Sequence, residues 1–218
     1  MWGSNFTFLV DVDCHEQTIK AVYKPVRGER PLWDFPPESL AGREVAAFLV
    51  SRALGWDFVP PTVFREDGPE GPGSLQLFVS HDPEYHYFNF LPQEKKHLPK
   101  VAIFDYLVNN TDRKGGHMIV GPNGDMWLID HGICFHSDPK LRTVVWDFAG
   151  EPIPDRETVA LHQFQRKIEE GGSLSEELRR YLTSEEIQAL RRRLEDLLQI
   201  GRFPTPSDRE RAYPWPAI

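Results

Sequence analysis

The chain has 218 residues, of which 40% are hydrophobic and 27% charged, and this is the composition of a globular protein with ample apolar material for a core. The length suits one two-lobed domain or two small domains. The net charge of -8 and the lack of a dense Lys/Arg cluster argue against binding to nucleic acid. The longest basic run, 191–193, has acidic neighbours in a helical pattern and is interpreted as a solvated helix face.

The two cysteines, Cys14 and Cys134, are far apart and form no CxxC motif. This indicates a reducing compartment and argues against a structural zinc cluster. No stretch approaches the length of a transmembrane helix, and the N-terminus lacks a charged-then-apolar signal segment. We therefore expect a cytoplasmic protein without stable membrane insertion.

Residues 1–80 have the pattern of a small α+β lobe built on a mostly antiparallel sheet. Period-2 alternation, helical spacing and Pro/Gly content distinguish its parts. The expected elements are a strand over 6–12, a turn over 13–17, a strand over 19–26, a loop over 27–40, a helix over 44–54, a loop over 65–73 and a strand over 75–79.

Residues 81–99 are irregular, polar and aromatic, and are interpreted as a connector to a mainly helical catalytic lobe over 100–202. A Pro-rich tail, 203–218, is expected to lie extended on the surface. Within the second lobe the expected elements are a helix over 101–109, a hairpin with strands over 118–120 and 126–129, and helices over 155–170 and 183–199.

Two aspartates carry most of the functional information. Asp112 lies in a polar, glycine-containing stretch after the predicted helix over 101–109, and Asp130 ends the apolar run 126–129. Phosphoryl transfer needs such a pair: one carboxylate orients a nucleophile and accepts its proton, and another holds a metal ion against phosphate oxygens. Asp112 is alternatively a simple turn acid. A charge at the end of a buried strand must be paired, solvated or metal-bound, and for Asp130 the metal role is favoured.

Lys24, Glu44 and His117 are further candidates, each with an ordinary structural alternative. Lys24 shares a strand face with Val22, which is unusual for a solvated lysine, and it would place a cation on nucleotide phosphates. Glu44 would pair with Lys24, although an acid near a helix N-terminus is also favoured by the macrodipole. His117 is either a histidine that caps the next strand or a ligand for metal or phosphate.

These residues occur in the order found in the protein-kinase-like fold, which the chain resembles: Lys24, Glu44, Asp112, His117, Asp130. The resemblance is strongest to the phosphatidylinositol 3-/4-kinase-related branch. The sequence Asn110-Thr111-Asp112-Arg113 is similar to the catalytic loop of type II phosphatidylinositol 4-kinases and HipA-like proteins. Further matches, over 23–26, 28–36, 110–117 and 129–135, resemble a bacterial family of kinase-like proteins.

The resemblance implies a role for each matched residue. Lys24 contacts the α- and β-phosphates of ATP and pairs with Glu44, Asp112 orients the acceptor hydroxyl, and Asp130 binds Mg²⁺. The stretch 76–80, which begins with Gln76, Leu77 and Phe78, would be the connector that holds the adenine edge through its backbone. The family pattern usually has Asn at the position of His117, and imidazole suits Mn²⁺ better than Mg²⁺. A phosphate-covering glycine loop would lie before residue 6.

The resemblance implies an ATP- and metal-dependent kinase that acts on a hydroxyl of a protein or small molecule. A lipid acceptor is less favoured, since the sequence has no basic membrane-facing patch. One alternative is a nucleotide-binding pseudokinase that serves as an interaction module. Another is a metal-dependent hydrolase with ligands from Asp112, His117, Asp130, His131 and His136.

The stretch 140–150 is interpreted as a structural loop. Asp147-Phe148-Ala149-Gly150 superficially resembles a kinase metal-binding turn, but it follows Asp130 and precedes helices, so Phe148 is expected in the core. Lys140, Arg142 and Trp146 lie where a kinase activation segment would run, and substrate contact is the alternative for them.

Overall fold

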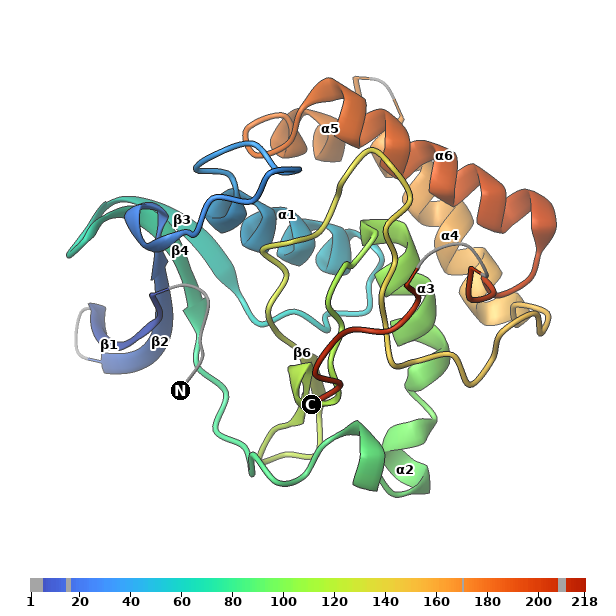
Figure 1. The fold of residues 1–218 in the computed structure, drawn as a ribbon, viewed down its shortest axis with the longest axis horizontal. Helices are drawn as coiled ribbons and strands as arrows, with labels where there is room; N and C mark the ends of the chain where they lie inside the picture. Colours follow the sequence, from blue (N-terminus) through green and yellow to red (C-terminus); the bar gives the residue numbers. More distant parts are fainter. Residues whose placement is uncertain (1–5, 15–16, 170, 208–210) are drawn as a thin grey trace.

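A computed structural model describes residues 6–14, 17–169, 171–207 and 211–218. The chain forms a small lobe built on a four-stranded sheet and a larger, mainly helical lobe (Figure 1). The two-lobed α+β fold expected from the sequence is thereby confirmed. The connector that includes α2 (Pro92–Lys95) runs between the lobes.

The sheet of the small lobe is antiparallel with strand order β1-β2-β4-β3. Its strands are β1 (Phe8–Cys14), β2 (Gln17–Pro25), β3 (Thr62–Gly68) and β4 (Gly71–Leu77). Residues alternate along β2, so that Ala21 and Tyr23 are buried while Val22 and Lys24 face a cavity between the lobes.

The prediction of a loop over 65–73 is wrong, because β3 and β4 form a hairpin there. Its glycines allow close packing that any side chain would block. A Cβ on Gly68 would lie 2.4 Å from the hydroxyl oxygen of Tyr23, and a Cβ on Gly73 would lie 2.5 Å from the carbonyl oxygen of Lys24. The Tyr23 hydroxyl donates a hydrogen bond to the Gly71 carbonyl. The glycines are therefore strand residues at sites of close approach, not loop residues.

Helix α1 (Leu40–Ala53) begins four residues before the predicted start at Glu44. Its first backbone N–H groups are capped from a distance: the Glu29 carboxylate accepts from Leu40 at 3.2 Å and from Ala41 at 2.8 Å. Glu44 consequently lies in the second turn, buried and not at the exposed helix start. The helix contacts the sheet through β3 and β4 and contacts the large lobe through α3 and α5.

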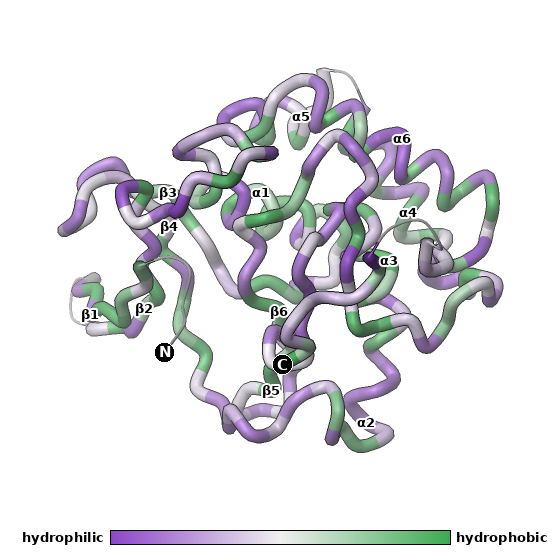
Figure 2. The backbone as a smooth tube through the Cα atoms, viewed as in Figure 1, coloured by the Kyte–Doolittle hydropathy of each residue, from purple (hydrophilic) through white to green (hydrophobic). Residues whose placement is uncertain are grey.

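The large lobe packs around α3 (Leu98–Val108), most of whose residues are buried. A short hairpin, β5 (Met118–Val120) with β6 (Met126–Leu128), follows it as predicted. Helices α4 (Asp155–Ile168) and α6 (Ser184–Ile200) cover the two predicted C-terminal helices, and α5 (Ser173–Leu178) between them was not predicted. Along α6 the hydropathy alternates, which is typical of a helix with one buried face (Figure 2).

The described tail residues after α6 lie against the large lobe in an extended path (Figure 1). The side chain of Phe203 is buried, and the carbonyl of Ala212 accepts a hydrogen bond from the backbone N–H of Thr143 at 3.1 Å. The carbonyl of Ala217 accepts from the backbone N–H of Gly115 at 2.7 Å. The tail is therefore anchored and partly buried, in contrast to a tail that only rests on the surface.

Within the described residues, no helix is both long enough and apolar enough to cross a membrane.

Candidate active site

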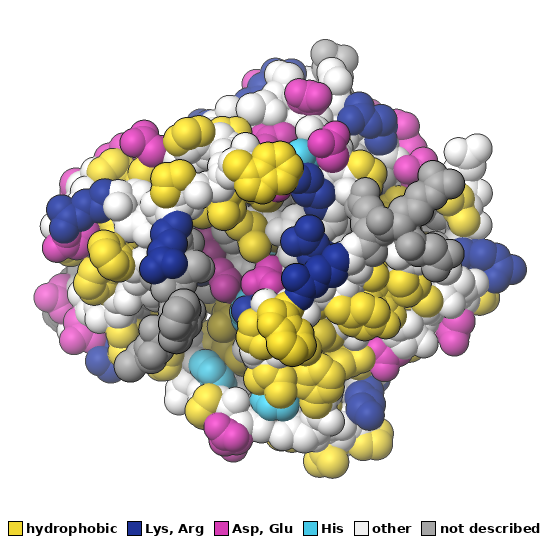
Figure 3. All heavy atoms as spheres, in the orientation of Figure 1, with side chains coloured by type: hydrophobic (Ala, Val, Ile, Leu, Met, Phe, Trp, Pro, Cys, Tyr) yellow, Lys and Arg dark blue, Asp and Glu magenta, His cyan; other side chains and the backbone are white. Residues whose placement is uncertain are grey.

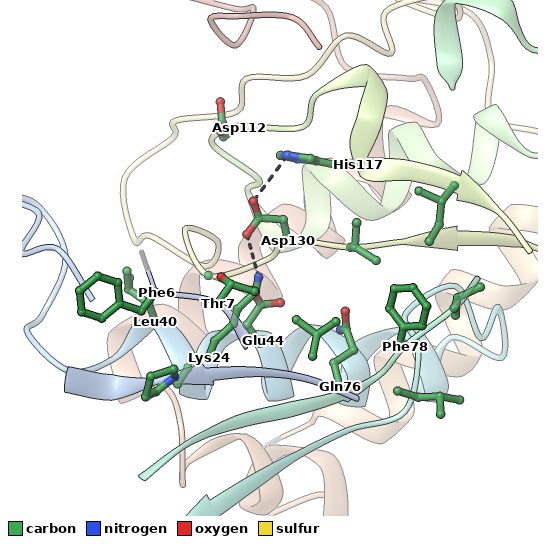
Figure 4. Close-up of a pocket in the computed structure, with 18 of the residues that line it drawn as sticks. Phe6, Thr7, Lys24, Leu40, Glu44, Gln76, Phe78, Asp112, His117 and Asp130 are labelled. Carbon is green, nitrogen blue, oxygen red and sulfur yellow. Dashed lines mark hydrogen bonds and ion pairs between the residues drawn. The ribbon is translucent and has the colours of Figure 1, made fainter. Parts of the chain in front are cut away.

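A cavity of about 460 Å³ lies between the two lobes. Its walls come from β2, α1 and β4 of the small lobe and from the segments around β5 and β6 of the large lobe (Figure 4). All the residues predicted for the kinase site line it: Lys24, Glu44, Gln76, Leu77, Phe78, Asp112, His117 and Asp130. The fold therefore brings side chains that are as far apart in sequence as Lys24 and Asp130 into one cavity.

Lys24 is the centre of the charged part of this cavity. Its Nζ pairs with Glu44 Oε1, and it lies 3.0 Å from Asp130 Oδ1. Burial alone would lower the pKa of Lys24, but the carboxylates of Asp130 and Glu44 outweigh burial and raise it above the ordinary value. The ammonium is therefore fully charged. The structure brings Lys24 and Glu44 together as the sequence order suggested (Figure 4).

Glu44 also contacts the loop that follows β6. Its Oε2 accepts a hydrogen bond from the backbone N–H of His131 at 3.0 Å. Since the side chain of Glu44 is only 3% exposed, these two contacts satisfy a carboxylate that has almost no access to water. One acid thus holds both the ammonium of the small lobe and the Asp130–His131 turn of the large lobe.

Asp130 stands on a strained turn at the end of β6, with a φ of +62°. This conformation is uncommon for a residue with a side chain, and it is often found at functional sites. The Lys24 ammonium is the main cause that lowers the pKa of Asp130, and His117 and His131 lower it further. Burial opposes them, but the net effect holds the pKa far below its usual range. The carboxylate is half-exposed toward the cavity and ionised at neutral pH.

His117 lies beside Asp130, with 3.5 Å between His117 Nε2 and Asp130 Oδ2. Burial is the main cause that lowers the pKa of His117 to about 4, and the nearby cations of Arg113 and Lys114 lower it further against the opposing effect of Asp130. The ring is therefore neutral at physiological pH. A neutral imidazole is able to serve as a ligand to a metal ion or as a donor to a phosphate oxygen.

Asp112 lies at the rim of the same cavity, apart from the Lys24–Asp130 pair (Figure 4). Its Oδ2 lies 3.5 Å from Lys114 Nζ, and its backbone N–H donates to Asn110 Oδ1 at 3.0 Å. Burial raises the pKa of Asp112, assisted by Asp130 and opposed by Lys114 and Arg142. A carboxylate with a raised pKa at a cavity rim suits the role of a proton acceptor. The two aspartates thus share a cavity without touching.

Arg113 organises the loop that carries Asp112, and the sequence alone did not indicate this role. Its fully buried guanidinium bonds Asp105 at 3.0 and 3.2 Å and the carbonyl of Ile129 at 3.0 Å. Its Nη2 lies 2.7 Å from His131 Nε2. Asp105, a charge in the middle of the apolar helix α3, was the signal in the sequence for a buried ion pair.

The wall opposite the aspartates is formed by the end of β4 and the residues that follow it. Gln76 uses its amide group to donate to Thr62 Oγ1 at 2.9 Å. The backbone N–H groups of Leu77 and Phe78 donate to Pro61 and Lys20 carbonyls at 2.9 and 3.0 Å. These two N–H groups are occupied within the small lobe, so the expected backbone contact to adenine from the stretch 76–80 stays a prediction that needs other groups of that stretch. Among the described residues, the N–H of the next lining residue, Val79, has no such partner.

The histidines proposed for a hydrolase do not assemble. His131 is fully buried and bonded to Arg113, and His136 packs edge-on against Phe35 with ring centroids 5.3 Å apart. In the described part of the chain, no three His, Cys, Asp or Glu side chains are arranged to hold a metal ion among themselves. A hydrolase with a metal held wholly by the protein is therefore not supported.

The stretch 140–150 has mainly structural contacts, as expected. Asp147 accepts from the Tyr87 hydroxyl at 2.7 Å, and Phe148 packs against Phe203. Lys140 Nζ lies 2.5 Å from Asp34 Oδ2, and Trp146 Nε1 donates to the Ala212 carbonyl at 3.2 Å. The expected glycine loop, 2–5, lies outside the described residues.

Comparison with known proteins agrees with this geometry. A model of the phosphatidylinositol 3- and 4-kinase family matches residues 56–200, a range that includes Asp112 and Asp130 and begins after Lys24 and Glu44. The protein Rv2133c of Mycobacterium tuberculosis is 41% identical over 251 residues, which cover 99% of this chain and 89% of that protein. Phosphatidylinositol 4-kinase gamma 4 of Oryza sativa subsp. japonica is 30% identical over 189 residues. That match covers 69% of this chain but 33% of the rice protein, so the chain spans about a third of this relative.

Two solved structures share the fold at low sequence identity. The Golgi casein kinase with Mn/ADP bound has a TM-score of 0.55 at 17% identity, and the match covers 91% of this chain and 70% of the casein kinase chain. The Helicobacter pylori proinflammatory kinase CtkA has a TM-score of 0.55 at 12% identity, and the match covers 93% of this chain and 90% of the CtkA chain. The family match supports the assignment of the chain as a kinase, and the two solved structures share its fold. The chain belongs to the phosphatidylinositol 3- and 4-kinase family.

Proposed function

We propose that the protein transfers the γ-phosphoryl group of ATP to a hydroxyl group of a protein or small molecule, with a divalent metal ion, Mg²⁺ or Mn²⁺. The observation that carries the proposal is the position of Lys24, whose ammonium is held between Glu44 and Asp130 at the centre of the cavity. A fixed cation beside an ionised carboxylate is what a triphosphate with its metal ion requires.

Each residue that lines the cavity has a separate role in this reaction. Lys24 contacts the phosphates while Glu44 fixes its position. Phe78 and Leu77 supply an apolar wall for the adenine ring, and the Val79 N–H is the donor for its edge. The rim carboxylate of Asp112 orients the acceptor hydroxyl and takes its proton, as the hydroxyl oxygen bonds to the γ-phosphorus and the bond to the leaving ADP oxygen breaks.

Asp130 and His117 fit a nucleotide-bound metal ion better than a metal site of the protein alone. Mg²⁺ typically takes one or two carboxylates and fills its remaining positions with phosphate oxygens and water. Asp130 offers a half-exposed, ionised carboxylate to the cavity, and the neutral ring of His117 lies 3.5 Å from it. When bound, the metal ion would neutralise charge on the phosphates. Imidazole next to Asp130 favours Mn²⁺ over Mg²⁺.

Thermal unfolding tests nucleotide and metal binding. ATP with Mg²⁺ or Mn²⁺ is expected to raise the Tm, metal alone is expected to raise it little, and Asp130→Asn is expected to lose the metal-dependent part of the shift. A wild-type protein with no shift from ATP and metal would contradict the proposal. An Asp130→Asn variant with the full shift would show that the metal is held elsewhere.

Transfer is tested with ATP labelled at either the α- or the γ-phosphate. Label from the γ-phosphate is expected in the acceptor or in the protein itself, and Asp112→Asn should reduce its incorporation by at least a hundredfold while the thermal shift remains. Label from the α-phosphate would instead identify nucleotidyl transfer. Nucleotide binding with neither label incorporated would identify a pseudokinase, an alternative that the separation of Asp112 from the Lys24–Asp130 pair keeps open.

A further inference from the structure

Two cations flank Asp112, and only one of them is bonded to it. Lys114 Nζ lies 3.5 Å from Asp112 Oδ2. The guanidinium of Arg142 is near enough to lower the pKa of Asp112, yet it makes no hydrogen bond or ion pair with any residue that the structure describes. Of the three residues that stand where an activation segment would run, Lys140 and Trp146 have side-chain partners, whereas the Arg142 side chain has no hydrogen-bond partner among the described residues.

The backbone fixes Arg142 against the catalytic loop. Its N–H donates to the carbonyl of Asn110 at 2.8 Å, and its carbonyl accepts from the N–H of Arg113 at 2.9 Å. These two contacts lie on either side of Asp112 in sequence. The backbone of Arg142 is therefore fixed next to the loop that carries Asp112, and only its half-buried side chain loses freedom when it binds an anion.

Two exposed tryptophans lie close in the chain to residues that contact this part of the structure. The ring of Trp33, 93% exposed, lies 4.9 Å from Lys140 Nζ, two residues before Arg142. Trp215, 80% exposed, lies two residues before Ala217, whose carbonyl bonds the Gly115 N–H of the catalytic loop. Neither tryptophan lines the nucleotide cavity. Figure 3 shows Lys and Arg side chains in a line beside the central hollow, with hydrophobic side chains above and below them.

We propose that this surface, made of Lys114, Arg142, Trp33 and Trp215, binds an acidic peptide segment of a partner protein and presents its hydroxyl residue to Asp112. The inference rests on the proposed function, because it names the acceptor of that site. A local cationic position on a chain of net charge -8 is matched by carboxylates, and two separated tryptophans suit an extended chain better than a small molecule.

Binding of fluorescein-labelled peptides without ATP tests the proposal separately from catalysis. We expect a serine-centred peptide flanked by Glu to bind about tenfold more tightly than the same peptide with Gln, since a charge-assisted hydrogen bond to Arg142 is lost. Arg142→Glu should remove this preference and favour a Lys-flanked peptide. Arg180→Glu, an equal charge change at an exposed position two residues after α5, is the matched control and should leave the preference intact.

The thermal shift with ATP and metal should be unchanged in Arg142→Glu, which shows that the variant is folded and its nucleotide site is intact. Equal binding of the Glu and Gln peptides, or equal effects of the two variants, would overturn the peptide assignment. Binding to phosphatidylserine or phosphatidylinositol vesicles with no peptide preference would overturn it in favour of a lipid surface. Loss of the wild-type nucleotide shift would refute only the proposed function, because the peptide measurement does not depend on it.

Discussion

The guanidinium of Arg113 lies 2.7 Å from the imidazole of His131, and this contact joins the two loops that carry Asp112 and Asp130. Arginine is only a donor, so Nε2 of His131 accepts and the ring proton resides on Nδ1. Burial, and after it the cation of Arg113, lower the pKa of His131 well below its ordinary value, which keeps the ring neutral. Nδ1 lies 3.9 Å from Glu44 Oε2, so the same ring faces the acid that holds Lys24.

His131→Ala is expected to destabilise the protein by about 2–4 kcal/mol, because it leaves a cavity and an unpaired donor on buried Arg113. Phosphoryl transfer should fall with it, since both aspartate loops lose their common support. His131→Gln retains an acceptor and should lose less stability. The measurement is urea unfolding, with His162→Ala on the exposed face of α4 as the control. Equal stability of His131→Ala and the control would refute the supporting role.

Lys24→Met is expected to lower the free energy of unfolding and to abolish nucleotide binding, and a second variant distinguishes the two effects. Removal of the ammonium leaves the buried carboxylate of Glu44 with one hydrogen bond among the described residues, from the His131 N–H, and loss of one partner from a buried pair costs about 3 kcal/mol. The double variant Lys24→Met/Glu44→Gln removes both charges and should recover most of this loss. Neither variant should show a thermal shift with ATP and metal. If the double variant were as unstable as Lys24→Met, the pair would not be the cause.

The low pKa of His117 predicts a loss of stability in mild acid. The unfolded chain binds a proton at this histidine near pH 6.5, whereas the folded protein resists protonation until about pH 4. Between these values the unfolded state binds more protons, so stability falls as the pH is lowered through that window and His117 contributes at most about 3 kcal/mol to the change.

Chemical denaturation at pH 7 and at pH 4.5 measures this effect. The wild type should lose more stability between these conditions than His117→Gln, which has no titrating ring but retains a polar side chain. His81→Gln is the matched control, because His81 also lines the cavity and its ring nitrogen lies 2.8 Å from the Val79 carbonyl. The same pH dependence in wild type and His117→Gln would show that other groups cause it.

The sequence indicated the two-lobed fold and the residues that meet in the cavity, because hydrophobic periodicity and residue order are local properties. It did not indicate Arg113 as the organiser of the site, since the importance of that residue depends on Asp105, Ile129 and His131, which the fold alone brings together. The β3–β4 hairpin was missed because glycine content predicts loops, whereas here Tyr23 requires the glycines.

The adenine wall shows a similar limit. The resemblance to the kinase-like fold named Gln76, Leu77 and Phe78, and all three line the cavity. Which N–H groups remain free depends on pairing with Pro61 and Lys20, partners that no pattern in the sequence specifies. Residue types and order therefore indicated the chemistry, and tertiary contacts determined which atoms are able to perform it.

The start of α1 provides a test of a long-range cap. Glu29 takes the place of a local N-cap side chain, because Ser39 makes no capping bond to the helix and the Glu29 carboxylate accepts from Leu40 and Ala41 instead. Glu29→Ala should destabilise the protein by about 1 kcal/mol, and Glu29→Gln, which retains one acceptor without the charge, should cost less. Because the first turns of α1 position Glu44, Glu29→Ala should also weaken the thermal shift with ATP and metal.

Glu38→Ala, which changes an exposed acid just before the helix, is the matched control. An equal loss of stability in Glu29→Ala and Glu38→Ala would refute the capping role.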